Sequence, residues 1–230
     1  MVPISAYKGE NLVKRSAKLE WYKGKPLIDV LYKEAKKEGR SQKGALRIVM
    51  QGVIPGEAGE HVVGRIASGT IKAGEKVNIL PQGAKAKVMG VTVKGKLVKV
   101  GNVGENVALQ LDRNFGDEMR GSIISDMNHK PKMTDVVKLR IFVTGRFGKR
   151  TVAKFNGVDI ECKSVRILHD IDTTTGEPRS TKKATILEAV EAEVRLARKV
   201  PVESYETTRE LGRFVLYSDN KFAGIGIFEG

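Results

Sequence analysis

The side chains that could do metal or covalent chemistry are few and far apart in this sequence. His61, His129 and His169 lack the close His or Cys partners that common zinc sites use. The single Cys162 cannot form an internal disulfide, which favours a reducing compartment, and we interpret it as a small buried thiol in an alternating strand. We therefore expect no metal site, and no local pattern indicates a catalytic triad.

The sequence also lacks the glycine-rich loops that hold nucleotide phosphates. No G-x-x-x-x-G-K-[ST] motif occurs, and Gly224-Ile-Gly226 lies in a predicted terminal strand rather than before a helix. Without such a loop no backbone N–H groups are arranged around the phosphates. We therefore expect that this chain is not an enzyme and does not hydrolyse a nucleotide by itself.

The net charge of the chain is the strongest indication of the kind of partner that it binds. Lys and Arg number 41 against 27 Asp and Glu, which gives a net charge of +14. An excess of this size attracts polyanions, of which RNA is the commonest, although a generally basic solvated surface is the alternative. One cluster falls on a predicted hairpin and the strand after it: Arg65, Lys72, Lys76, Lys85 and Lys87.

Lys85 and Lys87 are two residues apart in a predicted strand, so they project from one face. We hypothesise that this face contacts RNA phosphates; the alternative is a solvated outer face. A second cluster surrounds a glycine-rich turn at residues 145–148 and comprises Arg140, Arg146, Lys149, Arg150 and Lys154. It is either a docking site for a ribosomal or tRNA-shaped partner or an ordinary charged hairpin tip. Arg213 we interpret as structural, paired within or between domains.

The elements that must position these residues change character along the chain. Residues 26–38 place apolar side chains at helical spacing behind Pro26, which predicts a short amphipathic helix with a basic outer face. Residues 39–44 are polar and bounded by glycine, which predicts a linker. After the linker the hydrophobic period becomes two.

Two series of short, β-branched segments with glycine turns follow, and they predict strands. The first series comprises 46–53, 61–67, 76–80, 85–93, 96–100, 106–111 and 121–125. The second comprises 136–143, 150–155, 158–168, 184–197, 200–205, 211–217 and 222–228. Segment 184–197 is rich in Glu and Ala, but we predict a strand because its neighbours alternate. Closure removes exposed strand edges, so we predict an all-β fold of two consecutive β-barrels after a short helical segment.

Three stretches match motifs that occur together in one family. Residues 2–12 read VPISAYKGENL, residues 64–77 read GRIASGTIKAGEKV, and Tyr205 is followed by LGRFV and AGIGI. In this order they resemble the family of elongation factor 1-alpha and elongation factor Tu, with its class-2 release factor and ribosome-rescue relatives. The first resembles the last guanine-contacting motif of the G domain, the second the signature hairpin of the first barrel, and the third the closing strands of the second barrel.

The resemblance implies three parts. Residues 1–44 would be the C-terminal remnant of the G domain and a linker, residues 45–128 the first barrel and residues 132–230 the second. The rest of the G domain has no counterpart in the sequence, which suggests a split gene, a truncation or an incomplete sequence. We expect no cofactor in this chain, although the full-length family binds GTP and Mg²⁺. Ser5 and Ala6 would contact guanine only with the remainder of that domain present.

Departures from the family pattern leave several members open. Ala67 stands where the elongation factors have an acidic residue that helps hold the 3′ end of aminoacyl-tRNA, and alanine offers no acceptor. Residues 64–69 with Leu80-Pro-Gln-Gly83 resemble the GTPase subunit of ATP sulfurylase. Residues 175–177, Lys182-Lys183 and residues 209–214 instead resemble the rescue and release factors.

The resemblance and the charge together imply a function. We expect the non-catalytic effector part of a translation GTPase of the elongation factor 1-alpha type, which binds tRNA or a tRNA-mimicking protein, the ribosome and the G domain of the same factor. The alternatives are the barrels of the ATP sulfurylase subunit and a free-standing RNA-binding barrel protein. No apolar run approaches the length of a membrane span and no secretory leader opens the chain, so we expect a cytoplasmic protein without membrane contact.

Overall fold

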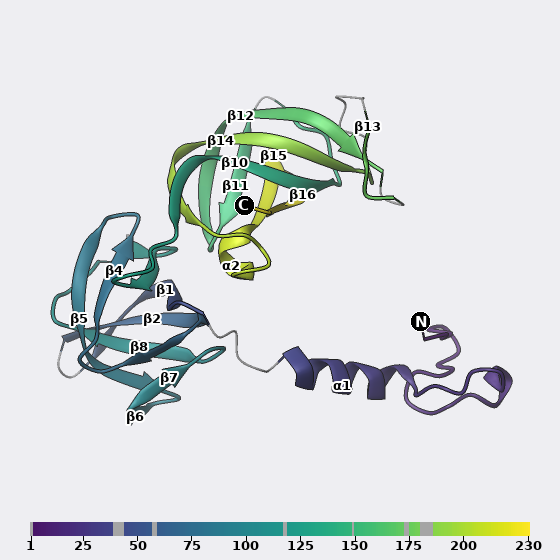
Figure 1. The fold of residues 1–230 in the computed structure, drawn as a ribbon, viewed down its shortest axis with the longest axis horizontal. Helices are drawn as coiled ribbons and strands as arrows, with labels where there is room; N and C mark the ends of the chain where they lie inside the picture. Colours follow the sequence, from purple (N-terminus) through teal and green to yellow (C-terminus); the bar gives the residue numbers. More distant parts are fainter. Residues whose placement is uncertain are drawn as a thin grey trace. The chain divides into compact units, whose positions relative to one another are not determined.

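The structure is a computed structural model that describes residues 2–38, 44–56, 59–116, 119–148, 150–172, 175–179 and 186–230. It divides into two compact units, Met1–Ser41 and Gln42–Gly230. The first holds a short 3₁₀ helix, η1 (Ala17–Leu19), and one α-helix, α1 (Leu27–Glu38). The second holds the strands, drawn as two groups of arrows in Figure 1. None of the described helices combines the length and the apolar character needed to cross a bilayer.

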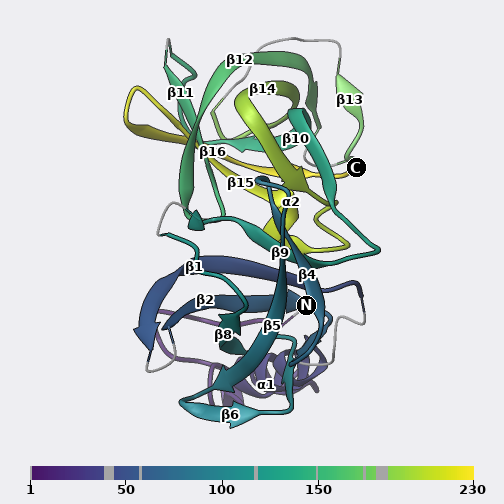
Figure 2. The ribbon, with the colours of Figure 1, turned by 90° about the vertical axis from the view of Figure 1, so that its left-hand side faces the viewer.

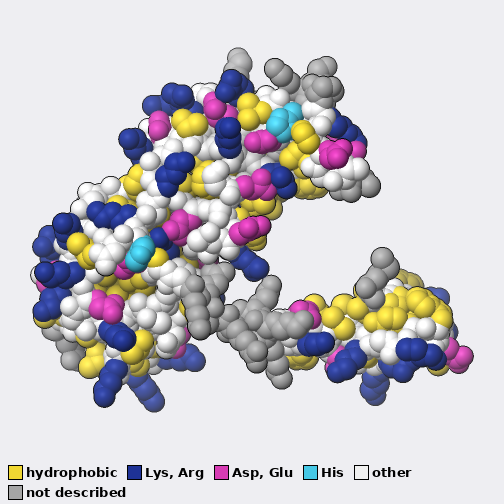
Figure 3. All heavy atoms as spheres, viewed as in Figure 1, with side chains coloured by type: hydrophobic (Ala, Val, Ile, Leu, Met, Phe, Trp, Pro, Cys, Tyr) yellow, Lys and Arg dark blue, Asp and Glu magenta, His cyan; other side chains and the backbone are white. Residues whose placement is uncertain are grey.

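The helix predicted over residues 26–38 is confirmed, and the chain before it supports its first turn. The N–H groups that open a helix have no partner within it. Here Leu27 N donates to Asn11 O (3.0 Å) and Ile28 N donates to Leu12 O (2.9 Å). The unit nevertheless leaves large apolar side chains in solvent, with Tyr7 98% and Trp21 70% exposed. Hydrophobic side chains gather along one side of this unit in Figure 3, and Lys and Arg gather along the other.

The first barrel is closed by six antiparallel strands among the described residues. Their order is β4-β9-β1-β2-β8-β5, and β5 pairs back with β4. The bounds are β1 (Arg47–Gly56), β2 (Gly59–Ser68), β4 (Lys76–Leu80), β5 (Ala84–Val93), β8 (Asn106–Leu111) and β9 (Ile123–Asp126). Strand β6 (Lys96–Val98) pairs with the end of β5, and β3 (Thr70–Lys72) pairs with β7 (Val100–Asn102). Figure 2 shows β1, β2, β8 and β5 as neighbours in the wall.

Alternation fills the first barrel with branched side chains. Ile48, Ile66 and Leu109 are completely buried, one each on β1, β2 and β8. The signature hairpin needs a glycine where β2 crosses β1 closely. A Cβ atom at Gly64 would lie 2.6 Å from Val49 O, so any larger residue would push the two strands apart. Gly64 is thus required by close backbone approach rather than by an unusual φ angle.

The second barrel repeats the architecture. Its strand order is β11-β15-β16-β10-β14-β12, and β12 pairs back with β11. The bounds are β10 (Lys132–Val143), β11 (Thr151–Phe155), β12 (Val158–Ile171), β14 (Ala189–Val202), β15 (Arg213–Ser218) and β16 (Lys221–Phe228). Strand β13 (Pro178–Arg179) pairs with the end of β12, and helix α2 (Arg209–Gly212) precedes β15. The predicted all-β fold of two closed barrels after a helical segment is therefore confirmed.

Several strand predictions differ in detail from the structure. The segments 184–197 and 200–205 belong to one strand, β14, which ends at Val202; residues 184 and 185 lie outside the described residues. The strand predicted from residue 211 begins at Arg213, because α2 occupies the preceding turn. Strands β3 and β13 were not predicted because each is too short to show alternation.

A buried arginine on β1 links the two barrels. Arg47 is 3% exposed, and its Nε donates to Glu203 Oε1 (2.9 Å) in the segment between β14 and α2. Arg47 Nη1 donates to Leu46 O (2.7 Å), and Glu203 Oε2 accepts from Thr208 Oγ1 (2.7 Å). The ion pair is thus hydrogen-bonded on both sides, which a buried pair requires to be stable.

Candidate nucleic-acid interface

The loop that carries Ser5 and Ala6 is closed on itself. Ser5 N donates to Glu10 O and Glu10 N donates to Ser5 O, both at 3.1 Å, so residues 6–9 form the tip of a tight loop. Lys18 Nζ lies 2.9 Å from Glu10 Oε1 and holds the loop from outside. Ser5 is half-buried and Ala6 is exposed. The structure thus presents both residues on one short loop within the first unit.

Three of the predicted basic residues come together on the first barrel and form what we call the lysine face: Lys76, Lys85 and Lys87. Lys76 on β4 lies directly opposite Lys87 on β5 in the antiparallel pair. All three lysines are exposed. Among the residues that the structure describes, none of the three has a carboxylate within ion-pair distance. Figure 3 shows Lys and Arg side chains gathered along the side of the barrel that β5 occupies in Figure 1.

The electrostatics of the lysine face favour an anion. Like charges directly opposite each other weaken a pair of strands. The carboxylate of Asp112 is engaged elsewhere, because its Oδ1 accepts from the backbone N of Lys87 (3.0 Å) and lies 3.6 Å from Arg113 Nε. An anion bound across Lys76 and Lys87 would therefore offset a repulsion that the barrel itself leaves uncompensated.

The other two residues of the first predicted cluster lie elsewhere. Lys72 ends β3, and its backbone N donates to Glu75 Oε2 (3.2 Å) in the following turn. Arg65 is exposed on β2 and lines a groove between the barrels. The five residues that are close in sequence are thus divided over three places on the barrel.

The second predicted cluster is also divided. Arg146 is exposed beyond the end of β10, and Lys149 lies outside the described residues. Arg150 and Lys154 line a pocket of about 230 Å³ on the outer wall of the second barrel, which we call the outer pocket. Arg140 belongs to a different part of the wall, where Arg140 Nη2 lies 3.1 Å from Glu229 Oε2.

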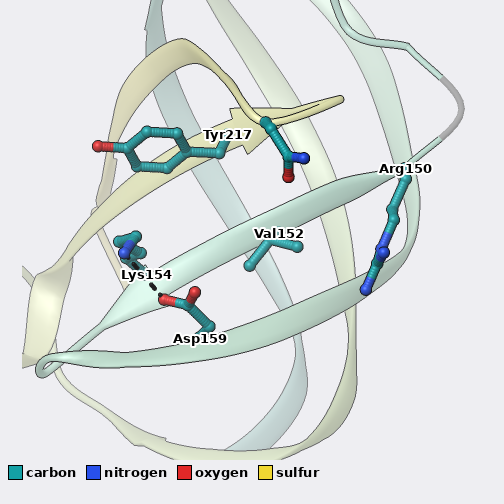
Figure 4. A pocket seen from close by; sticks show the side chains of 6 residues that line it. Arg150, Val152, Lys154, Asp159 and Tyr217 are labelled. Atoms are coloured by element: carbon teal, nitrogen blue, oxygen red, sulfur yellow. Dashed lines mark ion pairs between the residues drawn. The ribbon is translucent and has the colours of Figure 1, made fainter.

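Figure 4 shows how the outer pocket is built from β11, β12 and β15. Val152 forms its floor, and Tyr217 faces Lys154 across it. Lys154 Nζ lies 3.3 Å from Asp159 Oδ1 and 5.3 Å from the centre of the Tyr217 ring. Arg150 closes the other side, and it has no ion pair among the described residues. Its position is set by the β15–β16 turn, where Asp219 N donates to Arg150 O (2.9 Å).

The pocket combines an aromatic face, an apolar floor and an unpaired guanidinium. Aromatic faces take up bases or other flat groups, and guanidinium groups bind phosphates. The rest of the wall behaves differently. On β12 and β14, Arg166 Nη2 lies 3.0 Å from Glu193 Oε1 and His169 Nε2 lies 2.7 Å from Glu191 Oε2. Arg166 and His169 of β12 thus each lie beside a glutamate of β14.

Cys162 is half-buried, and His129 and His169 each lie beside a carboxylate. Burial raises the pKa of the Cys162 thiol to about 11, the direction expected of an inert structural cysteine. His129 Nδ1 lies 3.0 Å from Asp126 Oδ1, and His169 pairs with Glu191, as described above. Within the described ranges, no three His, Cys, Asp or Glu side chains are close enough together to hold a metal ion.

Sequence reasoning missed the roles of Tyr217 and Arg213. Tyr217 is brought beside Lys154 only by the pairing of β11 with β15. Arg213 was expected to form an ion pair, but it is exposed and has none in the part of the chain that the structure describes. It lines the groove between the barrels together with Arg65. No signal in the sequence placed either residue in a pocket, because each pocket is formed by strands far apart in the chain.

A protein-family model matches most of the second barrel. Residues 136–229 match the model of the GTP-eEF1A C-terminal domain-like family. Elongation factor 1-alpha of Aeropyrum pernix is 28% identical to this chain over 236 residues, which cover 98% of this chain and 54% of that protein. Elongation factor 1-alpha of Plasmodium falciparum is 29% identical over 236 residues, with 98% and 53% covered. The chain spans about half the length of these relatives.

Solved structures show the same fold. Sup35 complexed with GDP superposes with a TM-score of 0.76 at 20% identity, over 99% of this chain and 58% of that one. Translation elongation factor SelB from Methanococcus maripaludis superposes with a TM-score of 0.64 at 15% identity, over 90% and 48%. At these identities the likeness concerns the arrangement of the barrels. Together with the sequence relatives, it confirms the resemblance to the two-barrel C-terminal region of elongation factor 1-alpha-type proteins.

Proposed function

We propose that the two barrels bind RNA as the effector part of a translation factor. The match of residues 136–229 to the GTP-eEF1A C-terminal domain-like family is the starting point. The homology to elongation factor 1-alpha supports the inference that this chain is part of a translation factor. The ligand proposed is tRNA or a tRNA-mimicking protein, with the ribosome and a G domain of the same factor as further partners. We also propose parts bounded at residues 1–44, 45–128 and 132–230.

The lysine face is the observation that carries this proposal. Lys76 and Lys87 are directly opposite each other, and Lys85 projects from the same strand as Lys87, without carboxylate partners among the described residues. Phosphates spaced along an RNA backbone would neutralise such a row, and each contact releases bound counterions. The outer pocket adds Arg150 and the Tyr217 ring on the second barrel. Arg65, Lys72, Arg146 and Lys149 remain proposed contacts.

The Ser5–Ala6 loop has a separate proposed role. The backbone bonds between Ser5 and Glu10 hold the loop in a fixed shape, which a guanine contact requires. We propose that the loop contacts guanine when it is combined with the rest of a G domain. The barrels themselves we propose to bind rather than catalyse, because nucleotide hydrolysis requires a phosphate loop that this sequence lacks.

The test is tRNA binding at several salt concentrations, measured by fluorescence anisotropy with the Lys85→Glu/Lys87→Glu variant. Loss of two phosphate contacts should make the negative slope of log affinity against log salt shallower by about 1.4–1.8. It should also weaken binding at low salt. The matched control is Lys138→Glu/Lys221→Glu, which makes the same charge change at exposed lysines of the second barrel. Equal slopes for the wild type and the lysine-face variant would remove the face from the RNA contact.

A further inference from the structure

A groove of about 300 Å³ lies where the two barrels meet, separate from the lysine face. Its walls bring together three cations, two amides and one carboxylate from both barrels: Arg65, Lys154, Arg213, Gln51, Asn156 and Glu210. Arg65 and Gln51 come from β2 and β1 of the first barrel. The others come from the β11–β12 hairpin and the α2–β15 segment of the second. The groove therefore exists only when the barrels are joined.

The side-chain amide of Asn156 has a buried donor, Nδ2, without a hydrogen-bond partner among the described residues. Buried amide donors are almost always paired, and one left unpaired costs about 1–3 kcal/mol. Asn156 is held in place by the turn it forms with Gly157, in which both residues have positive φ angles of 51° and 78°. A ligand with an acceptor oxygen in the groove would satisfy this donor.

The charges of the groove select an anion. Arg65 and Arg213 are both exposed and have no ion pair in the described part of the chain. Lys154 Nζ forms an ion pair with Asp159 Oδ1 (3.3 Å), so the charge of Lys154 is partly offset. Glu210 is the single carboxylate among the lining residues that the structure describes. The two guanidinium groups thus leave a positive charge that no lining residue cancels in full.

We propose that this groove binds one phosphate group, with Arg65 and Arg213 clamping it from opposite barrels and Asn156 donating from the floor. A phosphate offers three or four acceptor oxygens in a tetrahedral arrangement, whereas a carboxylate offers two in one plane. Two guanidinium forks and two amides on different walls match the first better than the second. The inference rests on the proposed function only for the source of the phosphate, which we take to be RNA.

The site makes phosphate binding depend on the junction of the barrels. A group held by Arg65 and Arg213 links β2 of one barrel to β15 of the other. Binding at this place therefore stabilises the joined arrangement by mass action, because separated barrels cannot form the groove.

The experiment is an NMR titration of the full chain with inorganic phosphate at constant ionic strength. The side-chain amide resonances of Asn156 should shift and saturate. Arg65→Gln/Arg213→Gln should weaken that response about tenfold or more, because two charge-assisted contacts are removed. The matched control, Lys138→Gln/Lys221→Gln, removes the same charge from exposed positions outside the groove and should titrate like the wild type.

Three results overturn the proposal: a shift that does not saturate, an equal shift with acetate, or an undiminished shift in the arginine variant. The equal response to acetate would indicate a carboxylate site and hence an acidic protein partner. A short single-stranded RNA that displaces phosphate identifies RNA as the source; failure to displace it leaves a site for free phosphate. The Lys85→Glu/Lys87→Glu variant leaves the residues of the groove unchanged. The phosphate site and the proposed RNA contact of the lysine face are therefore tested independently of each other.

Discussion

At the scale of single residues, Asp126 ties the segment after β9 to the first barrel. Its Oδ2 accepts from Leu46 N (3.2 Å), and its Oδ1 accepts from Asn128 N (3.0 Å) and His129 N (2.7 Å). Burial raises the pKa of this carboxyl, but the backbone and ring hydrogen bonds of His129 and the backbone bond of Asn128 lower it. The net pKa lies below the ordinary value of 3.8. The ionised carboxylate is therefore part of the native structure.

This residue makes a pH prediction. A lowered folded-state pKa stabilises the protein at every pH above the unfolded-state pKa, and that contribution is lost as the pH falls through the folded-state value. We expect Asp126→Asn to lower the free energy of unfolding at pH 7, and the deficit to narrow below about pH 4. Urea unfolding between pH 7 and pH 2 measures it. The control is Asp135→Asn on β10, and a deficit that stays constant down to pH 2 would contradict the argument.

At the scale of elements, tight hairpins with left-handed turns hold the barrels in register. The β5–β6 turn has φ angles of 49° at Lys94 and 75° at Gly95, and the β15–β16 turn has 47° at Asp219 and 63° at Asn220. Two-residue turns of this kind match the twist of antiparallel strands, and they favour Asn, Asp and Gly. Lys94 is the exception in residue type, because the left-handed backbone conformation costs a lysine more free energy than it costs Gly, Asn or Asp.

The exception predicts a stabilising substitution. Lys94→Asn should raise the free energy of unfolding by about 0.5–1 kcal/mol, because asparagine adopts the left-handed region at lower cost. Lys96→Asn is the matched control: it removes the same charge from the same hairpin but stands in β6, outside the turn. Chemical denaturation of both variants decides the point. Equal effects of the two substitutions would show that charge rather than backbone conformation is responsible.

At the scale of the whole second unit, the Arg47–Glu203 pair joins two barrels that could otherwise separate. The two residues are 156 positions apart, and Arg47 Nη1 also lies 3.8 Å from Asp126 Oδ2. The side chains of Arg47 and Glu203 are 4% and 16% exposed. Removal of either partner leaves the charge of the other largely buried and without its counterion, which is costly. The pair is therefore one of the contacts that hold the two barrels together.

Arg47→Ala should lower the free energy of unfolding by about 3–5 kcal/mol, as expected when one half of a buried pair is removed. Arg166→Ala breaks the exposed pair with Glu193 and should cost at most about 1 kcal/mol. A double-mutant cycle with Glu203→Gln measures the coupling within the pair. Similar losses for Arg47→Ala and Arg166→Ala, or a coupling near zero, would show that the junction is held by other contacts.

Local pattern in the sequence determined the elements and the class of fold. Residues 189–196 are rich in Glu and Ala, yet Val190, Ala192 and Val194 alternate with polar neighbours, and all three are buried in β14. Alternation suffices because side chains on a strand face opposite sides in turn. The helix after Pro26, the two closed barrels and the resemblance to elongation factors could be predicted for the same reason: each depends on residues close together in the chain.

Tertiary structure decided which residues meet. Lys76 lies opposite Lys87 through the β4–β5 register, whereas Arg65, from the same predicted cluster, lines a groove between the barrels together with Arg213. Barrel closure brings Tyr217 to Lys154, and the join between barrels buries Arg47. These contacts connect strands through hydrogen-bond register and packing, which depend on the whole sheet. No short stretch of sequence carries that information, so the groove and the outer pocket emerge only from the folded chain.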